Sequence, residues 1–152
     1  MSSLELYYYL APMHVNSSYH VLEVLGGRIH DRAKLGLGYL KPNAAHQLWA
    51  FHQRYNGYYE IINKHSKLVL DDSRNNCDPG GEVYQFGRHD GDNQLWRIKR
   101  AKEHNCIHIL AKVSGFALDV GDWSQNNHAK INLWPKGNNQ ANQIWHLIPA
   151  SR

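Results

Sequence analysis

The tripeptide Gln47-Leu48-Trp49 returns twice along the chain, as Gln94-Leu95-Trp96 and Gln143-Ile144-Trp145. The copies lie 47 and 49 residues apart. A specific pattern that recurs at a nearly constant interval of this length indicates an internal structural repeat. The chain is therefore expected to contain three copies of one unit of about 48 residues.

A second pattern keeps a stricter period. An acidic residue follows an apolar pair every 48 residues, at Glu23, Asp71 and Asp119. The segments that lead into the last two acids, YYEIINKHSKLVLD (58–71) and CIHILAKVSGFALD (106–119), share five identical residues in ungapped register. We expect a single domain whose three units span approximately residues 1–55, 56–103 and 104–152, with no linker between them.

Each unit contains short apolar runs separated by clusters of Asn, Asp, Gly and Ser, which is typical of strands and turns. We expect an all-β fold with about four strands per unit. In the second unit the expected strands are 59–62, 67–70 and 82–86, with turns at 64–66 and 77–81. A lone unit of this length would expose its apolar face, so the three copies are expected to share one core with pseudo-threefold symmetry.

The composition is that of a folded, mildly basic protein. Its 152 residues are 42% hydrophobic and 20% charged, which argues against disorder and a coiled coil, and the formal net charge is +4. Two cysteines, Cys77 and Cys106, are too few for a disulfide scaffold, and both thiols are expected to be free. The chain begins without a signal-peptide pattern, so we expect a cytoplasmic protein, or one secreted without a classical signal peptide. No apolar run approaches the roughly 20 residues of a bilayer span, so membrane insertion is not expected.

Three Gln-x-Trp motifs, each preceded by an apolar-Leu-acid motif, resemble the repeats of the ricin B-type (R-type) lectins. The similarity covers essentially the whole chain. The resemblance implies a β-trefoil, in which a six-stranded barrel is capped by three hairpins. It also implies that the Gln-x-Trp residues lie mostly in the shared core, where burial of the indole stabilises the fold by several kcal/mol and the Gln amide satisfies backbone groups at a turn.

In that family each unit builds its own sugar site from four elements. These are an acid after the first apolar strand, an aromatic platform on a later strand, an amide two residues before the platform, and an Asn just before Gln-x-Trp. The third unit matches every element, so the resemblance implies a carbohydrate site formed by Asp119, Asn132, Trp134 and Asn142.

The second unit offers an altered version of this site. The corresponding residues are Asp71, Tyr84, Phe86 and Asn93. Phe stands in place of Trp, and Tyr stands in place of the amide. We expect a secondary sugar site here.

The first unit departs further from the pattern. The corresponding residues are Glu23, Gly36, Gly38 and His46, which leave no aromatic platform at position 38. Glu also loses more rotamer freedom than Asp when it is ordered. We expect no sugar site in this unit, with Tyr39, one position further along, as an alternative platform.

These residue types suit a galactose-like ring. The apolar C–H face of the ring lies flat on an indole, while vicinal hydroxyls donate hydrogen bonds to a carboxylate and exchange others with an amide. The resemblance therefore implies a non-catalytic lectin for galactose or N-acetylgalactosamine glycans. A shallow site of this kind binds with a dissociation constant of order millimolar, roughly 4 kcal/mol. Avidity would then come from two sites per chain or from a homodimer.

The tryptophan count favours a recognition surface in the third unit. Three of the five tryptophans occupy the repeated Gln-x-Trp position, which leaves Trp134 on the expected platform and Trp123 in the loop after Asp119. Trp123 has two alternatives: it flanks the sugar, or it packs beneath the loop. The rival function from another class is a β-trefoil protein-interaction module, such as a protease inhibitor or a cytoskeletal binder, whose loops do the binding.

Other chemistry finds little support in the sequence. His104, Cys106 and His108 would share one face of a strand, but surface histidines are the preferred interpretation, and neither a metal nor another cofactor is expected. The cationic run 97–102 lacks interleaved aromatic residues, so no nucleic acid is expected as a partner. No GxSxG, phosphate-binding glycine loop or nucleophilic Cys motif is present, so no enzymatic activity is expected. Residues 16–18 match the N-glycosylation sequence Asn-x-Ser/Thr, but this modification occurs in secreted proteins and is not expected here because no signal peptide is expected.

Overall fold

The computed structural model describes residues 5–15, 19–73 and 78–150, and in these ranges the chain forms twelve β-strands and five single 3-10 turns. The strands of the first unit are β1 (Tyr8–Pro12), β2 (His20–Val24), β3 (Leu35–Tyr39) and β4 (Trp49–Gln53). Those of the second are β5 (Tyr58–Asn63), β6 (Val69–Asp72), β7 (Gly81–Phe86) and β8 (Trp96–Arg100). Those of the third are β9 (Cys106–Ala111), β10 (Ala117–Val120), β11 (Ile131–Trp134) and β12 (Trp145–Pro149).

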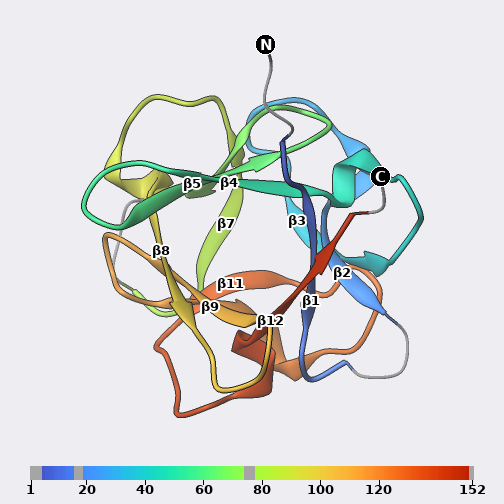
Figure 1. The fold of residues 1–152 in the computed structure, drawn as a ribbon, viewed down its shortest axis with the longest axis vertical. Helices are drawn as coiled ribbons and strands as arrows, with labels where there is room; N and C mark the ends of the chain where they lie inside the picture. The colour runs from blue at the N-terminus through green and yellow to red at the C-terminus, as the bar shows by residue number, and fades with distance from the viewer. Residues whose placement is uncertain (1–4, 16–18, 74–77, 151–152) are drawn as a thin grey trace.

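Six of these strands close into a barrel. The antiparallel pairings run β1–β4, β4–β5, β5–β8, β8–β9, β9–β12 and back from β12 to β1. In Figure 1 the pairs β4–β5, β8–β9 and β12–β1 form the three sides of a triangle around the centre. The other six strands pair as the hairpins β2–β3, β6–β7 and β10–β11. A six-stranded barrel with three hairpins is a β-trefoil, so the predicted fold is confirmed.

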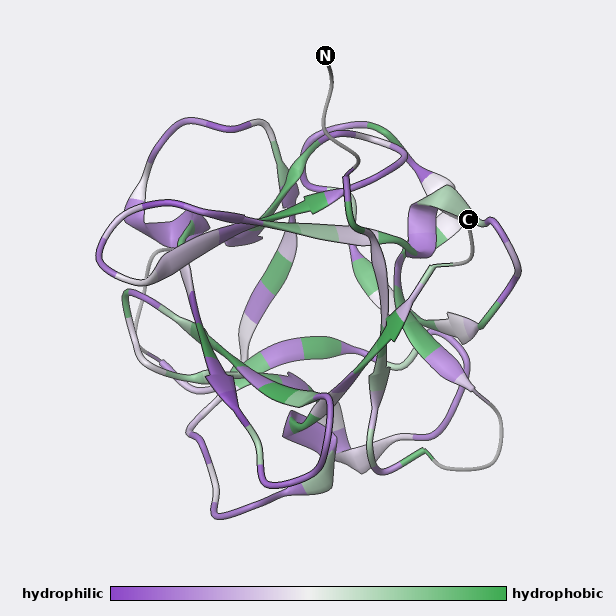
Figure 2. Ribbon diagram, in the orientation of Figure 1, coloured by the Kyte–Doolittle hydropathy of each residue, from purple (hydrophilic) through white to green (hydrophobic). Residues whose placement is uncertain are grey.

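The repeated tryptophans lie at the centre of this fold. Trp49, Trp96 and Trp145 are fully buried. Each indole N–H donates a hydrogen bond of 3.0 Å to the carbonyl of the Leu that precedes the acid of its own unit. The expected structural role is confirmed, and each Trp also ties its barrel strand to its hairpin. Figure 2 shows hydrophobic residues along the strands and hydrophilic residues along the outer loops.

Most of the expected strands of the second unit are found with small shifts. Residues 59–62 lie within β5, and residues 82–86 lie within β7. The strand expected at 67–70 begins two residues later, because Lys67 adopts a left-handed backbone (φ 65°) that completes the turn at 64–66. The turn expected at 77–81 is found in part. Pro79 and Gly80 form a turn, Gly81 already belongs to β7, and Cys77 lies outside the described residues. The glycosylation triplet at 16–18 is also outside them.

In the described part of the chain, no helix is long and apolar enough to cross a lipid bilayer.

Candidate functional site

The hairpin of the third unit places the expected platform, amide and acid on one face. Asp119 of β10 pairs directly with Asn132 of β11, and Ala117 pairs with Trp134. Side chains alternate along a strand, so residues 132 and 134 share a face, and a directly opposed pair has its Cβ atoms about 5 Å apart. The intervening Leu118 and Leu133 are buried in the core on the opposite face. The strand register therefore brings the predicted residues together.

The carboxylate of Asp119 is held from one side. The side-chain amides of Asn142 and Gln143 donate hydrogen bonds of 3.2 and 2.9 Å to the same oxygen, Oδ2. The other oxygen, Oδ1, accepts none from the described residues, and the residue is 5% exposed. Burial raises the pKa of Asp119, opposed by the two amide donors. A carboxylate with one fixed oxygen and one available oxygen is suited to accept hydroxyl hydrogen bonds from a ligand.

Gln143 has a role that the sequence reasoning missed. Its side chain is fully buried, accepts a hydrogen bond from the backbone N–H of Gly137 (2.9 Å), and donates to the carbonyl of Pro135 (3.1 Å) and to Asp119. The expected backbone role at a turn is confirmed, but the same amide also orients the carboxylate of the site. The equivalent bonds, Gln47 to Glu23 (2.8 Å) and Gln94 to Asp71 (2.9 Å), explain why each acid precedes its Gln by 23 or 24 residues.

A shallow cavity of about 290 Å³ lies over these residues. Trp134 and Trp123 are 48% and 49% exposed, so neither indole belongs to the core. The amide oxygens of Asn132 and Asn142 are buried and have no hydrogen-bond partner among the described residues. A buried acceptor without a partner is destabilising. The cavity is lined by Asp119, Gly121, Asp122, Trp123, Asn132, Trp134, Gln140 and Asn142.

The platform of the third unit is supported from the neighbouring unit. A Cβ atom added at Gly80 would lie 3.9 Å from Cζ3 of Trp134, and the N–H of Gly80 donates a 2.7 Å hydrogen bond to the carbonyl of Leu133. One edge of the indole thus lies close to the backbone that leads into β7 and leaves little room for a side chain at position 80. This contact joins residues more than 50 positions apart, and no repeat pattern predicts it.

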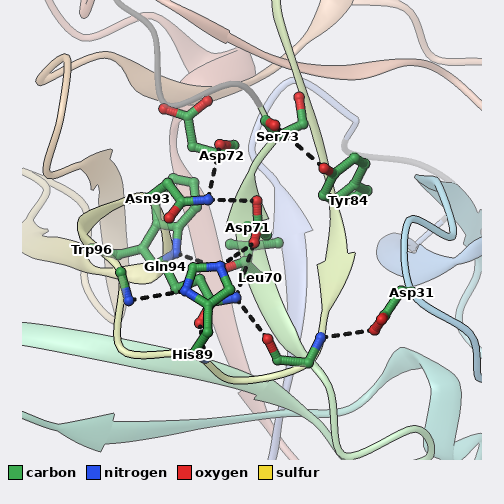
Figure 3. Close-up of polar contacts among 12 residues, drawn as sticks. Asp31, Leu70, Asp71, Asp72, Ser73, Tyr84, His89, Asn93, Gln94 and Trp96 are labelled. Carbon is green, nitrogen blue, oxygen red and sulfur yellow. Dashed lines mark hydrogen bonds and ion pairs between the residues drawn. The ribbon is translucent and has the colours of Figure 1, made fainter.

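The second unit brings its expected residues together in a more closed arrangement (Figure 3). Both oxygens of Asp71 are engaged: Asn93 donates to Oδ1 at 3.0 Å and Gln94 donates to Oδ2 at 2.9 Å, with His89 Nε2 at 3.8 Å from Oδ2. Asp71 is only 2% exposed, and burial raises its pKa. This carboxylate therefore has less capacity for a ligand than that of Asp119.

The aromatic residues of the second unit are covered by neighbouring side chains. The guanidinium of Arg32 lies 5.3 Å from the centre of the Phe86 ring, and the His89 ring meets Phe86 edge-on at 5.8 Å. Tyr84, which replaces the amide, stacks on Phe86 and donates its hydroxyl to the carbonyl of Ser73 at 3.3 Å. A sugar would have to displace Arg32 or His89 to reach the ring face.

The first unit fills its own site. Glu23 points its carboxylate into the space where the platform stands in the third unit, and a Cβ atom at Gly38 would lie 2.0 Å from Oε1 of Glu23. Gln47 and His46 hold this oxygen at 2.8 and 3.6 Å. Tyr39 lies on the opposite face of β3 from Gly38 and packs on the ring of His20, with centroids 4.5 Å apart. Tyr39 therefore supplies no platform at this position.

Another hollow, of about 380 Å³, lies where the three hairpins meet. Its lining includes Lys34, Lys130 and Glu82 around Leu35 and Ile131, but neither Phe, Tyr nor Trp and no buried carboxylate. It lacks the ring platform that a sugar requires. We therefore place the candidate site in the third unit.

In the described part of the chain, the side chains considered for a metal site do not come together, and one residue of the cationic run contacts an aromatic ring. His104 lies in the turn before β9 and does not share the strand with Cys106 and His108, which corrects the expected common face. Within residues 5–15, 19–73 and 78–150, no three His, Cys, Asp or Glu side chains are placed to hold a metal ion. In the cationic run, Arg97 lies over the ring of Tyr58, with its guanidinium 4.5 Å from the ring centre.

A family model described as ricin-type β-trefoil lectin domain-like matches residues 45–134 and 92–152. No protein with a curated description matches the chain. The designed threefold-symmetric protein ThreeFoil is 27% identical, with a TM-score of 0.86 over 93% of this chain and 97% of that protein.

Two natural proteins share the fold at lower identity. The exo-β-1,3-galactanase 1,3Gal43A from Clostridium thermocellum is 24% identical, with a TM-score of 0.87, and the match covers 97% of this chain but 31% of the galactanase. The Macrolepiota procera ricin B-like lectin, solved in complex with lactose, is 15% identical, with a TM-score of 0.76 over 97% of this chain and 98% of the lectin.

Proposed function

Because this chain belongs to the family of ricin-type β-trefoil lectin-like domains, we propose that it is a lectin that binds terminal galactose or N-acetylgalactosamine on glycans, without chemical turnover, in the third unit. The observation that carries the proposal is the pairing of a half-exposed indole, Trp134, with a carboxylate, Asp119, that has one oxygen available. The fold itself supports carbohydrate binding, and the choice of sugar is the part that we propose.

The site can bind a pyranose by two complementary contacts. The indole of Trp134 accepts the apolar C–H face of the ring, and burial of this apolar surface contributes about 25 cal/mol per Å². Oδ1 of Asp119 accepts hydroxyl hydrogen bonds that are strengthened by its charge. The side-chain amides of Asn132 and Asn142, which line the same cavity, add further hydrogen-bonding groups. Together these contacts account for a dissociation constant of order millimolar, roughly 4 kcal/mol.

The second unit contributes little in this proposal. Both oxygens of Asp71 already accept hydrogen bonds, and Arg32 lies over the ring of Phe86. One sugar is therefore expected to bind per chain with measurable affinity. Higher avidity would then require more than one chain on the same glycan surface, for example a homodimer.

A glycan array tests the proposal. We expect the wild-type protein to bind glycans that end in galactose or N-acetylgalactosamine, and Trp134→Ala to lose this binding. Phe86→Ala is the matched control, because it removes the corresponding aromatic residue of the second unit. A folded wild-type protein that binds no glycan would contradict the proposal and favour the protein-interaction module.

A further inference from the structure

Two consecutive residues beside the candidate site have backbones that favour glycine. Asp122 and Trp123 adopt φ angles of 56° and 54°, in the left-handed region that L-amino acids rarely occupy. At the same places in the first unit stand Gly26 and Gly27, with φ angles of 69° and 61°. The third unit therefore keeps the glycine backbone but carries an acid and an indole on it. Strain of this kind persists where the side chains serve a function.

The indole of Trp123 is presented to solvent and to the cavity. It is 49% exposed and lines the same cavity as Asp119 and Trp134. His14, from the first unit, meets it edge-on with the ring centres 6.1 Å apart and bonds through Nε2 to the carbonyl of Ser124 at 2.7 Å. The contact with His14 supports one side of the indole and leaves the other available. The alternative that Trp123 packs beneath the loop is excluded by its exposure.

Trp123 and Trp134 lie on opposite sides of the acid along the hairpin. Trp134 stands across from Ala117, whereas Trp123 follows the end of β10, beyond Val120. With a rise of about 3.3 Å per residue, residues 117 and 121 are separated by roughly 13 Å along the strand direction. A single ring on Trp134 that reaches Asp119 would therefore occupy one part of the cavity, and Trp123 borders another part of it. The remaining length fits a second sugar.

The cavity is also negatively charged. It contains the carboxylates of Asp119 and Asp122, and none of the eight described residues that line it is a Lys or an Arg. A sialic acid or uronic acid in this position would meet like charges without a compensating cation, which disfavours binding.

We propose that Asp122 and Trp123 form a second subsite that binds the penultimate sugar of a neutral glycan, next to a terminal sugar held by Trp134 and Asp119. This inference rests on the proposed lectin function and adds the length and the charge of the ligand. The indole of Trp123 provides the face on which the second ring lies, and the carboxylate of Asp122 excludes acidic substituents.

Calorimetric titration with galactose and with neutral galactose-terminated disaccharides of 1→3, 1→4 and 1→6 linkage tests the subsite. We expect at least one disaccharide to bind the wild-type protein about five- to tenfold more tightly than galactose. In Trp123→Gly this advantage should disappear, so disaccharide affinity should fall by a larger factor than galactose affinity. Glycine is the matched replacement because the first unit carries it at this backbone conformation, so the variant should fold, which thermal denaturation checks.

Three outcomes would overturn the subsite. The first is that no disaccharide binds the wild-type protein more tightly than galactose does. The others are that Trp123→Gly still binds the disaccharide more tightly than galactose by the wild-type factor, or that galactose affinity falls in this variant as much as disaccharide affinity. Failure of galactose and of every disaccharide to bind the wild-type protein is a different result and refutes the lectin function itself. For the charge, Asp122→Asn should bind a form of the preferred disaccharide whose penultimate ring is a uronic acid at least threefold better than the wild-type protein does. Equal weak binding by both proteins would refute the role of Asp122.

Discussion

Alanine substitution of two tryptophans in the same unit should separate binding from folding. Trp134 is 48% exposed and lies on the outer face of β11, whereas Trp145 is fully buried and donates its indole N–H to the carbonyl of Leu118. Loss of a buried Trp costs about 3–5 kcal/mol through the cavity it leaves. For a domain of about 150 residues, 1 kcal/mol shifts the melting temperature by roughly 2–4 °C. Trp145→Ala should therefore lower the melting temperature by roughly 6–20 °C.

Trp134→Ala should behave in the opposite way. Half of this side chain is already in water, so its removal is expected to cost less than about 1.5 kcal/mol of folding stability and to shift the melting temperature by a few degrees at most. Loss of the ring platform should weaken galactose binding about tenfold, which corresponds to about 1.4 kcal/mol. Thermal denaturation followed by circular dichroism and titration calorimetry with galactose measure the two effects. A loss of stability in Trp134→Ala equal to that in Trp145→Ala, or unchanged galactose affinity, would refute this reasoning.

Burial raises the pKa of Asp119, so folding favours the protonated form of this carboxyl group. Protonation of Asp119 therefore adds to the free energy of unfolding below the unfolded pKa of about 3.8, and this stabilisation is lost as the pH rises through the pKa of the folded protein. The pH dependence of binding has the opposite sign, since the sugar needs the carboxylate. Galactose affinity measured by calorimetry should begin to fall on acidification before pH 3.8 is reached, and Asp119→Asn should bind weakly at every pH without losing stability at pH 7. An affinity that is flat down to about pH 4 would contradict this assignment. Gln143→Leu should lose both galactose affinity and about 2–4 kcal/mol of stability in urea denaturation, because three hydrogen-bond partners lose a buried amide; unaltered affinity in a folded variant would show that Gln143 does not position the acid. The calorimetric stoichiometry with galactose should be one per chain and unchanged in Phe86→Ala, and a value near two in the wild-type protein would show that the second unit binds.

The repeat pattern was sufficient to predict an all-β fold with pseudo-threefold symmetry, because the same residues perform the same physical task three times, and the resemblance to the ricin B-type lectins added the β-trefoil. Each Trp of Gln-x-Trp bonds the carbonyl of a Leu about 27 residues earlier, so the spacing in the sequence reflects a contact in the barrel. The site residues of the third unit came from the resemblance to the ricin B-type lectins, and the structure shows that strand register pairs two of them, Asp119 and Asn132.

The features that distinguish the three units could not be predicted in this way. Arg32 covers Phe86 from another unit, and Gly80 supports Trp134 across a unit boundary. Such contacts depend on how different loops meet and have no counterpart in the repeat. The left-handed backbone at Trp123 was also hidden, because an aromatic residue does not indicate that conformation. Repetition thus identifies the scaffold, while the loops within the three hairpins decide which site stays open.

A crystal structure of the protein with galactose tests the central claim most directly. If the third unit is the lectin site, this structure will show one sugar there, with the ring lying on the indole of Trp134 and a hydroxyl within hydrogen-bond distance of Oδ1 of Asp119. A sugar bound elsewhere, such as the hollow lined by Lys34 and Lys130 or the second unit beside Phe86, would contradict it.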